Sequence, residues 1–165
     1  MSVDAITLRP AHQGDRFLIR RWLAEPGATR WWGTAARAEA EITLALASPS
    51  ALCRIVLAGA APAGYVQAVD ATLWGSGLPP DLPPGTYDVD LVVAAAPTAA
   101  DMARTALRLL ADEVFTTTFA AACAVFPPVA DEAATRIFEK AGFRWQRVWA
   151  DPVDGPAWLM LKRRP

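Results

Sequence analysis

The strongest local constraint on the fold lies near the C-terminus, where residues 133–143 have the sequence AATRIFEKAGF. Gly142 follows the helical part of this segment, at the position where a helix commonly ends in a left-handed conformation. Two extended runs come next, residues 144–150 and 157–162, and the hexapeptide DPVDGP between them consists of turn-forming residues. The segment therefore predicts a helix over residues 131–141 followed by two strands.

The rest of the chain alternates between strand-like and helix-like patterns. After Pro97, apolar residues recur at i, i+4, i+7 and i+11, which is typical of a helix with one buried face. Residues 91–94 are continuously apolar, as expected for a strand that is covered on both faces. Hairpins first and β-α-β units second predict an α+β fold, an α/β/α sandwich whose mixed, mostly antiparallel sheet has helices on both faces. The remaining predicted elements are strands over residues 6–10, 53–58, 63–70, 87–94 and 119–126, helices from Asp15 and over residues 35–47, and a loop over residues 71–85.

Length and composition limit the domain organisation and the partners. With 165 residues, 53% hydrophobic and 20% charged, the chain is long enough for one well-buried core and too short for two ordinary domains. Residues 1–165 are therefore expected to form a single domain. The formal net charge of −1 argues against a nucleic-acid binder, which needs clustered Lys and Arg. The abundance of Ala, and of Arg over Lys, is typical of a high-GC bacterial genome.

Cysteine usage and hydropathy exclude further classes of protein. Cys53 and Cys123 lie in apolar runs without a CxxC partner, and the chain has one histidine, so we expect buried thiols and no metal site. The apolar runs are shorter than the roughly 18 residues that cross a bilayer, and the N-terminus lacks the apolar region of a signal peptide. These features predict a cytoplasmic protein that binds neither metal nor membrane.

Short motifs occur along nearly the whole chain in an informative order. They are TLRP at residues 7–10, WWG at 31–33, AGYVQ at 63–67, DVD at 88–90, FEKAGF at 138–143 and DGPA at 154–157. Together they resemble the GNAT N-acetyltransferases, and most closely the branch that contains the aminoglycoside 6′-N-acetyltransferases and related siderophore-type acetylases. The resemblance implies the GNAT fold, with a V-shaped cleft between two central strands, in a monomer or a homodimer. It also implies acetyl-CoA as co-substrate and a small cationic substrate, aminoglycoside-like or polyamine-like, whose primary amine receives the acetyl group.

The predicted chemistry centres on the strand that begins with the acidic DVD motif. The resemblance implies that Asp90 orients and deprotonates the substrate amine, and that the backbone of Leu91, Val92 and Val93 stabilises the oxyanion. An acid that leads into a buried strand is costly without a partner, which favours a functional role for Asp90. Asp88 lies on the same face of the strand, at i−2. The alternative is that both acids cap the preceding loop and stay solvated.

The expected phosphate-binding loop departs from the family pattern. The family has a Gly-rich turn whose amides wrap the pyrophosphate, whereas residues 94–103 contain no glycine. Pro97 removes an amide donor, and Asp101 brings negative charge to the start of the helix, where a structural cap explains it well. The cofactor contacts that the resemblance implies in and around this loop are Ala99, Ala100, Met102, Ala103, Arg104 and Asp131.

Two more departures concern the helix over residues 131–141. Phe138 stands where the family commonly has a Tyr that protonates the leaving thiolate, and Asp131 stands where it commonly has an Asn that contacts the cofactor. They leave a second hypothesis open, a catalytically degenerate GNAT domain that acts as a ligand-binding or protein-interaction module. A third hypothesis is a transferase that uses a different acyl donor.

Aromatic and acidic residues in the loops indicate the substrate side. The chain has seven Trp residues, and several acids fall in its loops, so it could offer an acidic, aromatic-walled pocket to a cationic amine. The alternative is that the acids are solubilising and that the Trp residues pack the helices onto the sheet. The substrate contacts that the resemblance implies are Trp31, Trp32, Tyr65, Asp88 and Asp154.

Overall fold

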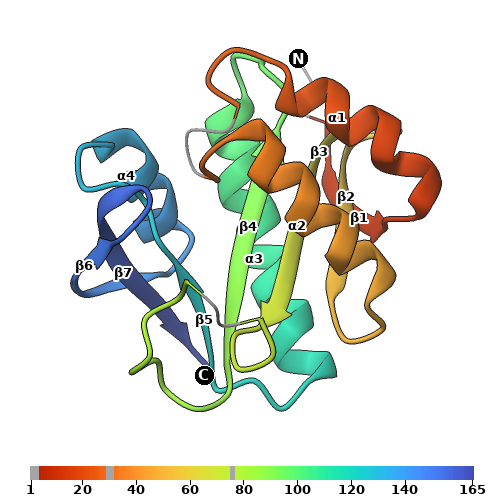
Figure 1. Ribbon diagram of the computed structural model, residues 1–165. Coiled ribbons are helices and arrows are strands. Elements are labelled where there is room, and N and C mark those ends of the chain that lie inside the picture. Colours follow the sequence, from red (N-terminus) through yellow and green to blue (C-terminus); the bar gives the residue numbers. More distant parts are fainter. Residues whose placement is uncertain (1–3, 29–31, 75–76) are drawn as a thin grey trace.

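A seven-stranded sheet forms the centre of the computed structural model, which describes residues 4–28, 32–74 and 77–165 (Figure 1). The strand order is β1-β2-β3-β4-β5-β7-β6, and the neighbouring strands pair antiparallel apart from β4 and β5, which pair parallel. The strands are β1 Ile6–Pro10, β2 Leu52–Ala58, β3 Ala61–Asp70, β4 Thr86–Val93, β5 Ala122–Val125, β6 Arg144–Asp151 and β7 Gly155–Arg163.

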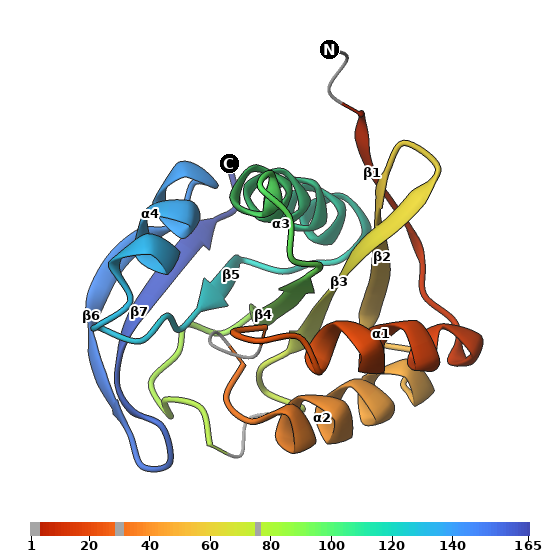
Figure 2. The same cartoon turned by 90° about the horizontal axis from the view of Figure 1, so that it is seen from above.

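Helices cover both faces of this sheet, as Figure 2 shows from above. A 3₁₀ turn at Gln13–Asp15 leads into α1, Arg16–Leu23, which lies with α2, Ala35–Ala47, on one face. The opposite face carries α3, Ala99–Thr117, and α4, Glu132–Lys140. The predicted α+β fold with an α/β/α arrangement and a mixed sheet is therefore confirmed. Within the described ranges, the helices are too short or too polar to cross a membrane.

Alternation along the central strands divides the core into two halves. On one face, Tyr65 and Val92 belong to a buried cluster with residues of α1 and α2. On the other face, Val66 and Leu91 belong to a cluster with residues of α3 and α4. Because successive side chains of a strand point to opposite faces, the acids at i−2 and i−4 from Val92 point toward the α1–α2 side. This geometry sets the face on which Asp90 and its neighbour act.

The signature segment near the C-terminus folds as the sequence predicts. Helix α4 ends at Lys140, and Gly142 follows with a φ of 101°, in the left-handed region that favours glycine. Phe138 is buried and packs edge-to-face against Phe143, with ring centroids 6.1 Å apart. The family motif therefore anchors α4 onto the sheet through its aromatic residues.

The structure shortens one predicted strand and shows how the start of α1 is held. The strand predicted over residues 119–126 covers only Ala122–Val125, and Phe119 is fully exposed. The residues before β5 form the turn out of α3, which the Arg164 guanidinium holds through the carbonyl oxygens of Phe115, Thr118 and Ala120. Asp15 precedes α1, but its carboxylate accepts from the His12 amide and pairs with Arg9, so it secures the 3₁₀ turn.

Candidate active site

A cleft of about 530 Å³ opens on the α1–α2 side of the sheet, between α2 and the β6–β7 turn. Its lining includes residues from α2, from β3 and β4, and from both strands of the β6–β7 hairpin next to its turn. Five acids line it, Glu41, Asp88, Asp90, Asp151 and Asp154, together with the aromatic residues Trp32, Trp74, Phe126 and Trp149. The predicted acidic, aromatic-walled pocket is therefore present, although the described residues contain no group of His, Cys, Asp or Glu arranged to hold a metal ion.

Asp88 and Asp90 form a coupled acid pair on the floor of the cleft. Burial is the main cause that raises the pKa of Asp88 to about 7, and the nearby Glu41 carboxylate adds to it. Burial also raises the pKa of Asp90 well above its usual range, and the charge of Asp88 contributes. The two acids therefore titrate as a pair, and both pKa values lie above the ordinary value of an aspartate.

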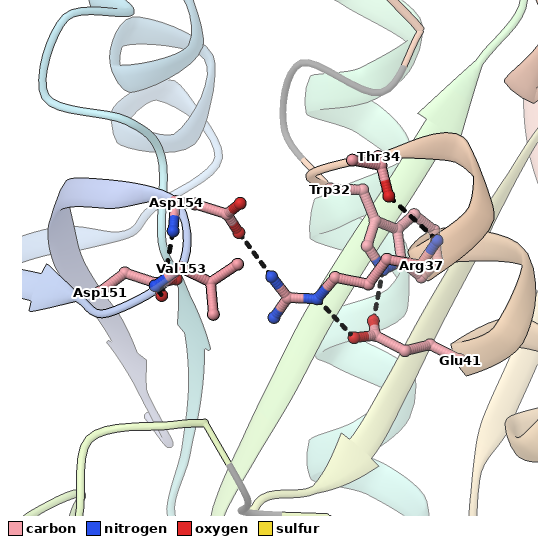
Figure 3. Close-up of polar contacts among 7 residues, drawn as sticks. All are labelled: Trp32, Thr34, Arg37, Glu41, Asp151, Val153 and Asp154. Atoms are coloured by element: carbon pink, nitrogen blue, oxygen red, sulfur yellow. Dashed lines mark hydrogen bonds and ion pairs between the residues drawn. The ribbon is translucent and has the colours of Figure 1, made fainter.

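Arg37 crosses the mouth of the cleft from α2 to the β6–β7 turn (Figure 3). Its Nη1 donates to Asp154 Oδ2 at 2.5 Å, and its Nε donates to Glu41 Oε1 at 3.1 Å. The other oxygen of Glu41 accepts from Trp32 Nε1 at 2.6 Å. Burial opposes the charge on Arg37, but the pairing with Glu41 and Asp154 outweighs it and raises the pKa of the guanidinium. A single cation thus joins acids from two distant segments.

Tyr65 does not itself line the cleft, contrary to its predicted substrate contact. The side chain is fully buried, its ring stacks on Trp32 at 6.2 Å between centroids, and its hydroxyl donates to Gln67 Oε1 at 2.8 Å. Trp32 and Gln67 do line the cleft. The reason for the difference is that Trp32 covers the Tyr65 ring. Tyr65 therefore orients two wall residues, and predicted Trp31 lies outside the described residues.

The turn between β6 and β7 places Asp154 over the cleft. The Asp151 carboxylate accepts from the amides of Val153 and Asp154, at 2.8 and 3.3 Å, which fixes the turn from within. Asp154 extends from this turn toward Arg37 (Figure 3). Of the predicted substrate contacts, the structure thus brings Trp32, Asp88 and Asp154 together around one cleft with Asp90.

Strands β4 and β5 separate beside the acid pair. Their parallel register covers residues 86–88 of β4 only, whereas β4 continues to Val93 while paired with β3. The Ala94 amide donates to the Ala63 carbonyl of the β3 side, so by alternation the backbone of Val92 also faces β3. The N–H groups of Leu91 and Val93 then face the side where β5 has diverged. Of the three residues predicted to stabilise an oxyanion, these two have the suitable orientation, and Val92 does not.

The loop before α3 is partly occupied by the protein's own acceptors. The Ala95 amide donates to Glu25 Oε2 at 2.7 Å, so a carboxylate lies where the family pattern leads us to expect a phosphate. The amides of Ala99 and Met102 donate to the carbonyl oxygens of Ala96 and Thr98. Among the amides predicted to bind cofactor, that of Ala100 lies in the first helical turn, where no intrahelical acceptor exists.

The remaining predicted cofactor contacts have structural surroundings of their own. Met102 and Ala103 lie on the buried face of α3, so their side chains belong to the core. Arg104 pairs with Asp101 at 3.3 Å and stays partly exposed. The Asp131 carboxylate accepts from the Ala134 amide at 3.1 Å and caps α4. The residues present thus fit the acetyl and pantetheine part of a CoA ester along β4 better than they fit its pyrophosphate.

The sequence did not single out Arg37 and Glu41, which the structure places in the cleft. On a helix, Arg37 and Glu41 form an i,i+4 pair, a pattern that usually marks a solvated face. The signal that distinguishes them is the short spacing from Trp32, which places an indole N–H beside the first turns of α2. The ion pair of Arg37 with Asp154 spans 117 residues and is not visible in local sequence.

The sheet, with its parted central strands and acid pair, defines a class of acyl-transfer enzyme. The sequence model of the acetyltransferase (GNAT) domain family matches residues 12–150 of the chain. The chain therefore belongs to this family of enzymes. The resemblance noted in the sequence is therefore confirmed.

Particular relatives are aminoglycoside acetyltransferases. The chain is 29% identical to aminoglycoside N(6′)-acetyltransferase type 1 of Klebsiella pneumoniae and equally to that of Serratia marcescens, over 99% of this chain and 85% of each relative. The crystal structure of aminoglycoside acetyltransferase AAC(6′)-Ib with coenzyme A superposes with a TM-score of 0.83 at 26% identity, covering 97% of this chain and 95% of the other. A second structure of that enzyme, with coenzyme A and kanamycin, gives a TM-score of 0.82 at 27% identity and the same coverage.

Proposed function

We propose that this protein transfers an acetyl group from acetyl-CoA to a primary amine of a small cationic molecule, of the aminoglycoside or polyamine class. The observation that carries the proposal is the Asp88–Asp90 pair, set in an acidic, Trp-lined cleft where β4 and β5 part. The relatives named aminoglycoside acetyltransferases, and solved with coenzyme A and kanamycin, support the donor and the class of acceptor. They do not favour a degenerate binding module.

The acids of the cleft, its aromatic walls and the backbone of β4 have separate roles in this proposal. The substrate arrives as an ammonium, which the acids attract and the aromatic walls accommodate. The Asp88–Asp90 pair accepts a proton from the amine, with Asp90 as the predicted base and Asp88 as its coupled partner. Acetyl-CoA supplies an acetyl group that its thioester already activates. The N–H groups of Leu91 and Val93 donate to the carbonyl oxygen as negative charge develops on it.

The altered residues are compatible with this chemistry. Phe138 is buried against Phe143 and supplies no proton, but a thiolate is a tolerable leaving group without a general acid. Arg104 and the first-turn amide of Ala100 are the groups near the start of α3 that suit a phosphate. We further propose that the chain acts in the cytoplasm as a single domain, in a monomer or a homodimer.

The test is acetylation itself. Purified protein with acetyl-CoA and kanamycin is expected to release thiol, which a thiol-reactive dye detects, and to yield a monoacetylated product by mass spectrometry. Asp90→Asn should lower kcat by roughly a hundredfold or more, since it removes the proton acceptor. Asp112→Asn, which changes an exposed acid on α3, should leave kcat unchanged. Absence of both acetyl-CoA binding at millimolar concentration and thiol release with a panel of amines would refute the proposal.

A further inference from the structure

Arg37 is the one basic side chain among the described residues that line the cleft. It faces five lining acids, and its charge lowers the pKa values of Asp88 and Asp90 against the larger effect of burial. Its field therefore reaches the floor of the cleft as well as the acids at the mouth. The positive charge of the guanidinium therefore offsets the negative charge of these acids, as the charge of a bound ammonium would.

Glu41 and the turn that carries Asp154 are each held by contacts that do not involve Arg37. Trp32 Nε1 donates to Glu41 Oε2, and this bond does not involve Arg37. The turn that carries Asp154 is fixed by the Asp151 carboxylate. Two oxygen acceptors, one on each wall of the cleft, are thus preorganised for a cation whether or not Arg37 occupies them.

The contact of Arg37 with Asp154 is also easy to exchange. The two side chains are 39% and 43% exposed, and ion pairs between such exposed side chains contribute little to stability. The long, flexible stem of Arg allows the guanidinium to swing into solvent while its backbone stays in α2. A ligand that brings its own positive charge can therefore take its place at low cost.

We propose that Arg37 is a specificity-determining residue that acts as an internal competitor, because its guanidinium occupies the position between Glu41 and Asp154 where a second ammonium of a polycationic substrate binds. One ammonium of such a substrate reaches the Asp88–Asp90 pair, and another displaces Arg37. A monoamine meets the repulsion of Arg37 without gaining its acceptors. The substrate class is therefore an amine with at least two separated ammonium groups, and this inference rests on the proposed function of the cleft.

The experiment measures binding without acetyl-CoA, so that it does not depend on turnover. Calorimetric titrations compare spermine, with several ammonium groups, and butylamine, with one, on the wild type and on Arg37→Gln. Removal of one competing charge should tighten spermine binding roughly tenfold and butylamine binding less than about threefold. Methylguanidine at about 10 mM should restore the weaker spermine binding of the wild type by refilling the vacated position.

Matched variants separate this effect from others. Arg20→Gln removes the same charge from an ion pair between α1 and α2 outside the cleft, with Glu39, and should leave both affinities within about twofold. Arg37→Lys keeps the charge and should stay close to the wild type. The inference is overturned by unchanged spermine affinity in folded Arg37→Gln, by equal gains for both amines, or by an equal gain in Arg37→Lys or Arg20→Gln. Acetyl transfer without these differences would refute the role of Arg37 alone, and binding differences without acetyl transfer would refute the proposed function alone.

Discussion

Replacement of Asp88 by Asn is expected to stabilise the protein at alkaline pH. The folded chain raises the pKa of Asp88 from 3.8 to about 7, mainly through burial. An acid whose pKa is higher in the folded state binds more protons there than in the unfolded chain, so its effect on the free energy of unfolding becomes unfavourable as the pH rises. The unfavourable effect is absent below about pH 4 and nearly complete above about pH 7.

The size of the effect follows from the two pKa values. A rise of this extent corresponds to about 4 kcal/mol if the carboxylate were fully shielded from water. Asp88 is half-buried at the floor of an open cleft, so water screens its charge and about 2 kcal/mol is the better expectation. The amide that Asp88→Asn introduces keeps the size of the side chain and a carbonyl oxygen that accepts hydrogen bonds, but it has no charge to desolvate.

Urea unfolding at two pH values measures this difference. The free energy of unfolding of Asp88→Asn should exceed that of the wild type by about 2 kcal/mol near pH 8 and by less than about 0.5 kcal/mol near pH 4. Asp112→Asn, at an exposed site on α3, should match the wild type within about 0.5 kcal/mol at both pH values. A variant that is no more stable than the wild type near pH 8, or equally stabilised at both pH values, would show that desolvation of the ionised Asp88 does not destabilise the folded state.

Two further changes test the backbone and the donor loop. A Cβ on Gly64 would lie 2.7 Å from the Val92 carbonyl oxygen and 3.1 Å from Val93 Cα, so Gly64→Ala should lower the free energy of unfolding by about 2 kcal/mol in urea titrations. Gly14→Ala, with open space around it, should change that free energy by less than about 0.5 kcal/mol, and equal effects would contradict the close approach. Glu25→Gln removes the negative charge on the Ala95 amide and should strengthen acetyl-CoA binding roughly threefold or more by calorimetry, and unchanged or weaker binding would place the phosphates elsewhere.

Local sequence patterns were sufficient for most of the fold. The helix that begins after Pro97 and the helix that precedes Gly142 follow from periodicity and from a C-terminal glycine, both of which act over a few residues. The error at Phe119 has a physical reason, since an apolar residue is usually placed inside, whereas this one lies in a turn held by Arg164. Apolar character alone does not report where a chain leaves a helix.

The site was predictable only where one strand carries it. Asp88 and Asp90 stand side by side on β4, so alternation was enough to place them on one face. Tyr65 was correctly placed on its strand, but the ring of Trp32 that covers it comes from another segment. Arg37 is recognised as a residue of the cleft through its contact with Asp154, which the fold brings to it from near the C-terminus. Contacts of this kind depend on tertiary packing, which local spacing does not encode.

Acceptor binding, acyl transfer and pyrophosphate binding depend on different parts of the chain, which explains how the altered loop and an active cleft can coexist. The acceptor half uses side chains, and its acids and aromatic residues are in place. The acyl-transfer step uses backbone N–H groups of β4, which any sequence supplies if β4 and β5 part beyond residue 88. Only pyrophosphate binding depends on glycine in the family pattern. In this chain, Glu25 accepts from the Ala95 amide of that loop, and Asp101 adds a second negative charge. Loss of the Gly-rich turn therefore weakens ground-state binding of the donor, and it leaves the groups that act on the transition state untouched.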